Sequence, residues 1–111
     1  MNFIYHITRP DNVNRQKEYF PVAIGADGFI HCATKAQLLK SISKFHSHFT
    51  NIAILEINPQ KLDSNLVWEK NHAAGDIYPH LYGLINQAAV EKIFLLQREE
   101  NATFQLPEEL S

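Results

Sequence analysis

Residues 27–34 read DGFIHCAT, and this stretch organises the rest of the chain. Its first two residues, Asp27-Gly28, form a turn dipeptide, and the apolar run Phe29–Cys32 behind them predicts a short buried strand. Thr34 stands three residues before Gln37, which is the spacing of a capping box at the start of a helix. The stretch therefore predicts a turn, a strand and a helix start in direct succession.

The helix that begins here is amphipathic. Over Lys35–His48 and the residue after it, large apolar side chains recur at steps of four, three and four, which places them on one helical face. These are Leu38, Ile42, Phe45 and Phe49. The pattern therefore predicts an amphipathic helix over Lys35–His48, with a polar opposite face.

Other stretches read as strands or short connections. Alternating or continuous apolar runs predict strands, Pro10 followed by a polar run predicts a short helix stopped by Pro21, and Gly75 predicts a loop. The expected strands are Asn2–Thr8, Ile52–Ile57, Leu66–Lys70 and Val90–Arg98; the short helix is Pro10–Tyr19, the loop His72–Pro79, and one further helical turn Asn86–Ala89. Several strands and one good helix, without regular alternation, predict an α+β domain with mainly antiparallel pairing.

The chain has 111 residues, which is the size of a single domain. We expect this domain to occupy residues 1–98 and the acidic segment 99–111 to be a loosely held tail. The tail carries four glutamates and no lysine or arginine, whereas residues 1–98 carry ten basic and eight acidic side chains. This weak charge excludes the electrostatic footprint of a general nucleic-acid-binding protein.

The sequence contains no long apolar run of the kind that spans a membrane, and its start does not read as a signal peptide. Its single cysteine, Cys32, excludes an internal disulfide and suits a reducing compartment. We therefore expect a cytoplasmic protein with no membrane partner.

Three histidines and one carboxylate are the candidate functional residues. His6 and His31 stand on predicted strands, His80 lies in an aromatic-rich loop, and Glu69 precedes that loop. Each histidine could also be a buried core residue that donates one hydrogen bond to a backbone carbonyl. If they are functional, we expect all three to converge on one concave site. The remaining histidines, His46, His48 and His72, are expected to be solvated.

Three kinds of chemistry remain open for these residues. The first is a zinc site with Glu69 as fourth ligand or base, although no local metal-binding spacing supports it. The second, a Cys32–His31 nucleophile–base pair, is disfavoured because neighbouring strand residues point to opposite faces. The third is a pocket for a ribose-bearing ligand, in which histidines bind hydroxyl groups and tyrosines stack on a ring. No glycine-rich phosphate loop is present in the sequence.

Four motifs, in this order along the chain, resemble the bacterial domain-of-unknown-function family numbered 952. The resemblance runs from about residue 2 to residue 98, and the second and fourth motifs are the most specific. The motifs are Ile4-Tyr5-His6-Ile7, residues 27–34, Trp68-Glu69, and Pro79-His80-Leu81-Tyr82-Gly83.

The resemblance implies a fold and a cofactor. The family is grouped with the ADP-ribosyltransferases, which implies a split, bent antiparallel sheet around an NAD-binding cleft. It is also similar to the NAD-dependent RNA 2′-phosphotransferases in the order of its elements. By this analogy His6 would hold an NAD ribose hydroxyl, His31 would sit on the second cleft strand, and Thr34 would cap the following helix and bind near the cofactor.

The resemblance leads to three hypotheses. The first is an enzyme for NAD-dependent ADP-ribosyl or phosphoryl transfer, with His31, Glu69 and His80 as catalytic residues. Tyr78 and Tyr82, together with His6 and Thr34, would then bind the cofactor. The second is a binding module that holds a nucleotide or nucleotide-derived metabolite without turnover, and the third is a histidine-based metal protein. An extended RNA substrate is disfavoured by the low positive charge.

Overall fold

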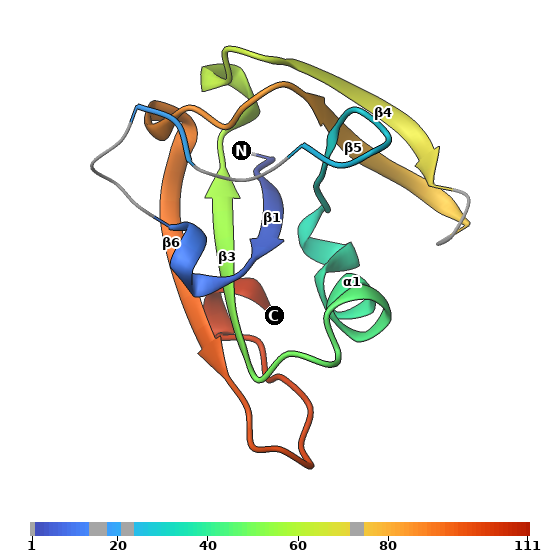
Figure 1. The fold of residues 1–111 in the computed structure, drawn as a ribbon, viewed down its shortest axis with the longest axis vertical. Helices are drawn as coiled ribbons and strands as arrows, with labels where there is room; N and C mark the ends of the chain where they lie inside the picture. The colour runs from blue at the N-terminus through green and yellow to red at the C-terminus, as the bar shows by residue number, and fades with distance from the viewer. Residues whose placement is uncertain (1, 14–17, 21–23, 72–74) are drawn as a thin grey trace.

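Strand β3 (Asn51–Ile57) is the centre of the first sheet, as its continuous apolar run predicts (Figure 1). It pairs antiparallel with β1 (Ile4–Thr8) on one side and with β6 (Val90–Gln97) on the other. These three strands confirm three of the predicted strands. The structure is a computed structural model that describes residues 2–13, 18–20, 24–71 and 75–111.

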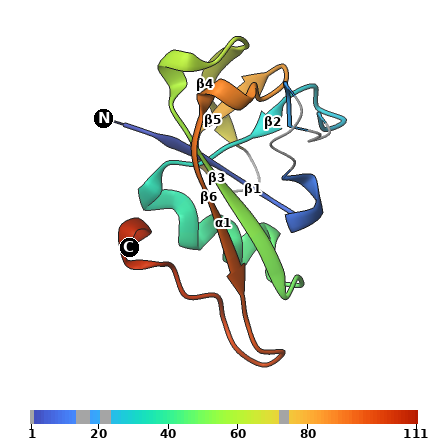
Figure 2. The same ribbon diagram turned by 90° about the vertical axis from the view of Figure 1, so that its left-hand side faces the viewer.

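The second sheet has the order β2–β5–β4 and is also antiparallel throughout. Its strands are β2 (Ile30–His31), β5 (Asp76–Tyr82) and β4 (Asn65–Asn71). Figure 2 shows these strands gathered at one end of the molecule, beyond the first sheet. In the described part of the chain, two three-stranded antiparallel sheets and one α-helix confirm the α+β class.

The segment 30–33 joins the two sheets through its backbone. Ile30 and His31 pair with β5, while Ala33 forms an isolated bridge to Tyr5 of β1. The Ala33 amide donates to the Tyr5 carbonyl at 2.7 Å, and the Tyr5 amide donates to the Ala33 carbonyl at 2.8 Å. The two sheets are therefore linked by main-chain hydrogen bonds as well as by side-chain packing.

Among the described residues, the core consists of two main apolar clusters, one on each face of β3. Leu55 and Ile57 belong to the cluster that also holds Ile30 and Leu81 of the second sheet. Ile52 and Ile54, at the alternate positions, belong to the cluster shared with α1. Since successive residues of a strand point to opposite faces, a strand covered on both sides must be apolar at nearly every position.

Helix α1 (Leu38–Phe45) is preceded by a single 3-10 turn, Lys35–Gln37. The Thr34 amide donates to the Gln37 side-chain oxygen at 3.0 Å, which is one of the bonds of the predicted capping box. The α-helix ends at Phe45, earlier than the predicted end at His48. Phe45, on the predicted apolar face, is 39% exposed, so the last turn of this face is only partly covered.

The predicted loop His72–Pro79 is wrong over its second half, because β5 begins at Asp76. Gly75 adopts a φ of 72° and its amide donates to the Asn71 carbonyl, so it makes the turn into β5. Pro79 lies within the strand, where its carbonyl accepts a hydrogen bond from the Cys32 amide at 3.0 Å. Because glycine and proline usually interrupt strands, Gly75 and Pro79 led to the prediction of a loop where the chain forms a strand. The predicted loop residues 72–74, which include His72, lie outside the described residues.

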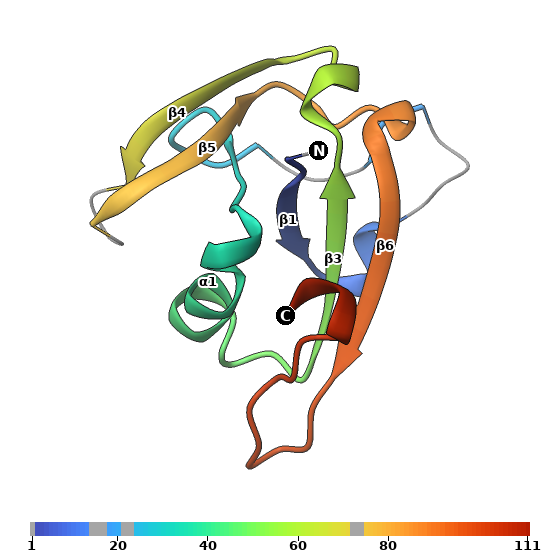
Figure 3. The ribbon, with the colours of Figure 1, turned by 180° about the vertical axis from the view of Figure 1, so that it is seen from behind.

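The C-terminal segment is not a loose tail. Phe104 and Leu110 are buried in the cluster between the first sheet and α1, and Figure 3 shows the chain end lying beside that helix. The Arg98 guanidinium ties the segment down by donating to several backbone carbonyls, including those of Phe49 and Ala102. The acidic composition of the tail concealed two core residues.

The remaining predictions are met in part. The turn Gln87–Ala89 confirms the predicted helical turn, whereas the strand predicted over Phe29–Cys32 is reduced to Ile30–His31. Of the helix predicted over Pro10–Tyr19, only the 3-10 turn Pro10–Asn12 is observed, Tyr19 forms a β-bridge, and residues 14–17 and Pro21 lie outside the described residues. Among the described residues, no helix combines the length and apolar character needed to cross a bilayer.

Candidate functional site

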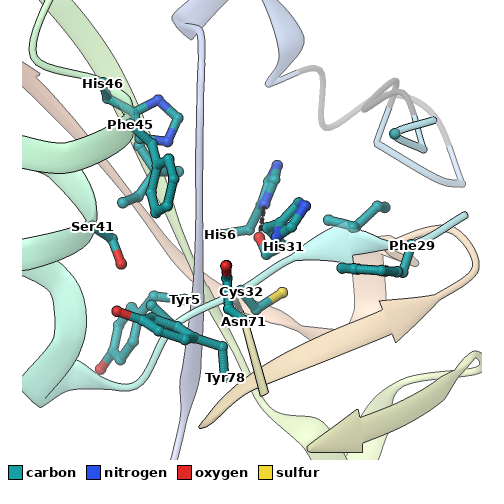
Figure 4. Close-up of a pocket in the computed structure, with 14 residues that line it drawn as sticks. Tyr5, His6, Phe29, His31, Cys32, Ser41, Phe45, His46, Asn71 and Tyr78 are labelled. Carbon is teal, nitrogen blue, oxygen red and sulfur yellow. Dashed lines mark hydrogen bonds between the residues drawn. The ribbon is translucent and has the colours of Figure 1, made fainter. Parts of the chain in front are cut away.

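A cavity of about 290 Å³ opens between β1, α1 and the segment that joins the sheets. Strand β1 contributes Tyr5 and His6, the joining segment contributes His31, and β5 contributes Tyr78 (Figure 4). The wall on the α1 side is formed by Ser41, Phe45 and His46. This first cavity is mainly aromatic and apolar, with a few polar atoms, which is the usual character of a small-molecule site.

His6 is held in one protonation state at this cavity. Its Nδ1 lies 2.7 Å from the His31 carbonyl oxygen, which can only accept, so Nδ1 carries the hydrogen. Burial lowers the pKa of His6 from 6.5 to about 4, so the ring is neutral at neutral pH. Its Nε2 therefore has a free lone pair that can accept a hydrogen bond from a hydroxyl or N–H group.

Two tyrosines add polar groups to the first cavity. The Tyr5 hydroxyl donates to Glu56 at 3.1 Å, and burial together with that carboxylate raises the pKa of Tyr5 to about 12. The Tyr78 hydroxyl is buried and has no hydrogen-bond partner in the described part of the chain. A buried hydroxyl without a partner costs stability, so it marks a position where a bound ligand can supply the missing bond.

A second cavity, of about 370 Å³, adjoins the first and shares Phe29, His31 and Asn71 with it. On its β4–β5 side, the Glu69 carboxylate accepts hydrogen bonds from the Tyr82 hydroxyl and from His80 Nδ1, the latter at 3.0 Å. These bonds lower the pKa of Glu69, with the Tyr82 bond as the largest cause, and they raise the pKa of Tyr82. Glu69 is therefore an oriented, ionised carboxylate.

His80 is almost completely buried, and its Nε2 has no partner among the described residues. Because Nδ1 lies against the Glu69 carboxylate, which accepts, Nδ1 carries a hydrogen, and in the neutral form of the ring Nε2 is a hydrogen-bond acceptor. The Phe29 ring stacks on the imidazole with its centroid 3.9 Å away and a tilt of 22°. A carboxylate-oriented histidine with a free Nε2 is a common arrangement for proton transfer.

A second histidine–carboxylate pair stands opposite the first. His31 Nε2 lies 3.0 Å from Asp27 Oδ2, and the two side chains are 52% and 47% exposed. The His31 ring centroid lies 5.3 Å from that of His80, with the rings nearly perpendicular. Both members of this pair are thus about half exposed, whereas in the other pair His80 is buried under Phe29 and Glu69 is 38% exposed.

The candidate residues divide between the two cavities, instead of lining a single cleft. His6 and Tyr78 line the first cavity, and the second is lined by Glu69, His80 and Tyr82. His31 lines both, so it connects the two groups. Thr34 lines neither of these two cavities; its amide donates a hydrogen bond to the Gln37 side chain and so caps the following helical turn.

Of the histidines expected to be solvated, His48 meets the expectation and His46 does not. His48 is exposed. His46, at the end of α1, is half-buried and lines the first cavity, and burial lowers its pKa. The expectation of a solvated His46 is therefore wrong.

The other two kinds of chemistry find little support in the geometry. Cys32 is buried in the core, and this burial raises the pKa of its thiol to about 12, which is unfavourable for a nucleophile. Among residues 2–13, 18–20, 24–71 and 75–111, no group of three or more histidine, cysteine or acidic side chains is arranged to hold a metal ion.

Sequence reasoning missed Asp27, Phe29 and Ser41 as site residues. Asp27 stands four residues before His31 across the turn at Gly28, whose φ of 89° brings the two side chains together. Tyr78, His80 and Tyr82 share one face of β5 because they alternate along a strand. This alternation in the sequence could have indicated that the three side chains share a face, but residues 76–79 were predicted to be a loop.

The family model described as "Protein of unknown function (DUF952)" matches residues 4–93. The chain belongs to this family. The matched region contains every described residue that lines the two cavities, from Tyr5 to Tyr82. The DUF952 match therefore covers the whole candidate site, whereas the buried residues Phe104 and Leu110 lie beyond it.

Solved structures similar to this DUF952 protein include the crystal structure of protein CC0527 from Caulobacter crescentus. The TM-score is 0.79 at 24% identity, and 97% of each chain is covered. The solution NMR structure of CC0527 gives a TM-score of 0.74 at 23% identity and covers 93% of this chain and 91% of that one. At this level of identity the likeness shows a shared fold alone. No curated protein matches the sequence.

Proposed function

We propose that this DUF952 protein uses NAD as a co-substrate and transfers its ADP-ribosyl group to a small acceptor. The observation that carries the proposal is the meeting of His6, His31 and His80, from three separate strands, at two adjoining aromatic cavities. The first cavity, at about 290 Å³, is near the lower end of ligand-pocket volumes. It suits the nicotinamide riboside half of NAD better than the whole dinucleotide.

The lining of the first cavity supports the oxidised nicotinamide ring as its occupant. None of its described lining residues has a permanent charge, because Asp27, Glu69 and Lys70 line only the adjoining second cavity. A lining without lysine or arginine offers a phosphate group no charged partner, whereas a cationic ring gains from aromatic faces such as those of Tyr78 and Phe29. The phosphates of NAD would then extend away from these cavities.

The chain's own groups match what cleavage of the nicotinamide–ribose bond requires. Neutral His6 Nε2 accepts a hydrogen bond from a ribose hydroxyl, the role that the ADP-ribosyltransferase resemblance assigns to this position. The oriented Glu69 carboxylate lines the adjoining second cavity, so its negative charge would stabilise the positive charge that develops on the ribose only where the ribose reaches the junction of the cavities at His31. The same resemblance extends to the NAD-dependent RNA 2′-phosphotransferases, but the scarcity of lysine and arginine at the site argues against RNA as acceptor.

The alternative is a binding module that holds a nucleotide or nucleotide-derived metabolite without turnover. One observation favours it: Glu69 lines the second cavity and is engaged by His80 and Tyr82, so it is not directed at the first cavity. In that case the histidines and tyrosines provide recognition only.

Thermal unfolding with and without NAD tests the proposal. Millimolar NAD on a site of ~10 μM affinity adds about 2.7 kcal/mol to the free energy of unfolding. NADH, whose ring is uncharged, should stabilise the protein less. His6→Gln should reduce the NAD effect, while His48→Gln, at an exposed histidine outside both cavities, should not.

Following NAD over hours by NMR separates the two functions. Release of nicotinamide supports the transferase, and stabilisation without consumption supports the binding module. If NAD leaves the melting temperature unchanged, the NAD-dependent transferase is refuted, and the binding module is refuted for NAD as its ligand.

A further inference from the structure

The second cavity contains more proton-transfer chemistry than the binding of NAD requires. It brings together two histidine–carboxylate pairs, Asp27–His31 and Glu69–His80, with ring centroids 5.3 Å apart. It also shares His31 with the first cavity, so a molecule bound here lies next to a molecule bound there. This is the placement needed for the second reactant of a group transfer.

The Asp27–His31 pair is built to accept a proton. Asp27 Oδ2 lies 3.0 Å from His31 Nε2, so Nε2 of the neutral ring donates to the carboxylate and Nδ1 has a free lone pair. The carboxylate then stabilises the imidazolium that forms when Nδ1 takes up a proton. Because both side chains are about half exposed, the proton can pass on to solvent.

The Glu69–His80 pair offers recognition at the covered end of the cavity. His80 Nε2 is buried and has no partner in the described part of the chain, so it can accept a hydrogen bond from a ligand. The Phe29 ring that stacks on His80 also lines the cavity, and because Nε2 is buried, neighbouring side chains must shift for a ligand to reach this atom. An acceptor molecule with hydroxyl or amino hydrogens supplies the missing donor.

The charge of the cavity selects the class of that molecule. Asp27 and Glu69 contribute two carboxylates, against the single ammonium group of Lys70. A phosphate or carboxylate ligand is repelled, and a neutral or cationic one is favoured.

We propose that the second cavity is the acceptor subsite for a small neutral or cationic alcohol or amine, and that the Asp27–His31 pair takes its proton. The proposal rests on the proposed function. His31 Nδ1 removes the proton from the acceptor O–H or N–H, and the acceptor oxygen or nitrogen forms a bond to C1′ of the ribose. The bond from C1′ to the nicotinamide nitrogen breaks, and its electron pair leaves with the nicotinamide, which becomes neutral. No oxidant or reductant is needed.

NMR of the histidine side chains in the full chain tests the subsite without NAD. Ethanolamine, a cation that carries both a hydroxyl and an amino group, is titrated against the 15N-labelled protein, with inorganic phosphate as the anionic probe. The imidazole signals of His31 and His80 should shift and saturate with ethanolamine and should not respond to phosphate. Phosphate shifts at these two histidines, or no shift with either probe, would overturn the proposal.

Asp27→Asn tests the role of the pair, and Asp11→Asn, at an exposed acid outside both cavities, is the matched control. The variant Asp27→Asn should weaken ethanolamine binding about tenfold and should alter the 15N shifts that report the His31 tautomer. The control should do neither. Wild-type tautomer shifts in Asp27→Asn would show that Asp27 does not position His31.

Adding NAD separates the two proposals. Wild-type protein with NAD and ethanolamine should form an ethanolamine adduct of ADP-ribose, detected by mass spectrometry, and Asp27→Asn should lose most of it while still being stabilised by NAD. If NAD stabilises the protein but ethanolamine leaves His31 and His80 unmoved, the acceptor subsite alone is refuted. If ethanolamine shifts both histidines but NAD neither binds nor is consumed, the proposed function is refuted, and the acceptor role with it.

Discussion

Leu110 offers a direct test of how the C-terminal segment is held. It is 1% exposed and packs in the cluster formed by α1 and the first sheet, which includes Leu38 and Ile42. Truncating a buried leucine to alanine removes its apolar contacts and leaves a cavity, at a cost of about 2–5 kcal/mol. We expect Leu110→Ala to lower the free energy of unfolding by about 3 kcal/mol.

Urea unfolding followed by circular dichroism measures this loss, and thermal unfolding should show a fall in melting temperature of about 12 °C. Leu95→Ala is the matched control, because Leu95 is 64% exposed on β6 and its truncation should change stability by less than about 0.5 kcal/mol. Equal, small effects of the two substitutions would refute the reasoning and restore the loose tail that the acidic composition predicts.

Three further predictions follow from the site. Burial lowers the pKa of His6 from 6.5 to about 4, so between these pH values the unfolded chain binds a proton that the folded protein does not. The free energy of unfolding should therefore fall by about 3 kcal/mol as the pH drops through this range. The urea midpoint of His6→Gln should vary less with pH over that window, and an unchanged pH dependence would contradict the assignment. Glu69→Gln should reduce NAD consumption by about a hundredfold or more with little change in NAD affinity, and should let the phenol pKa of Tyr82 fall towards 10.0 in an ultraviolet titration. Cys32, whose thiol pKa is raised to about 12 by burial, should resist an aromatic disulfide reagent in the folded protein and react once the chain is unfolded in urea; rapid reaction of the folded protein would show that the thiol is accessible.

Local sequence signals predicted the elements whose side-chain pattern is complete within a few residues. The apolar run of β3 required burial on both faces, and the spacing of Thr34 and Gln37 located the start of the helical segment. By contrast, Pro79 and Gly75 are residues that usually interrupt strands, and they hid β5. The strand is defined by its pairing with β4, its neighbour along the chain, and with β2, which lies much earlier in the sequence, and the residues of β5 alone do not reveal this pairing.

The site was predictable in its histidines and not in their partners. His6, His31 and His80 stood out as histidines in apolar or aromatic surroundings. In the structure His6 lines the first cavity, His80 lines the second, and His31 lines both. The pairing of Asp27 with His31 depends on the backbone turn at Gly28, and that geometry is invisible in residue spacing alone. Phe104 was missed for a similar reason, because its burial comes from contacts with residues far away in the sequence.

The backbone link between the two sheets has a consequence for how this site can vary. His6 comes from one sheet and His80 from the other, and their separation is set largely by the reciprocal amide bonds of Tyr5 and Ala33 and by the pairing of segment 30–33 with β5. Main-chain bonds of this kind do not depend on which side chains the positions carry. Substitutions that line the cavities can therefore accumulate during evolution without moving the scaffold, so one backbone frame can serve ligands of different shape.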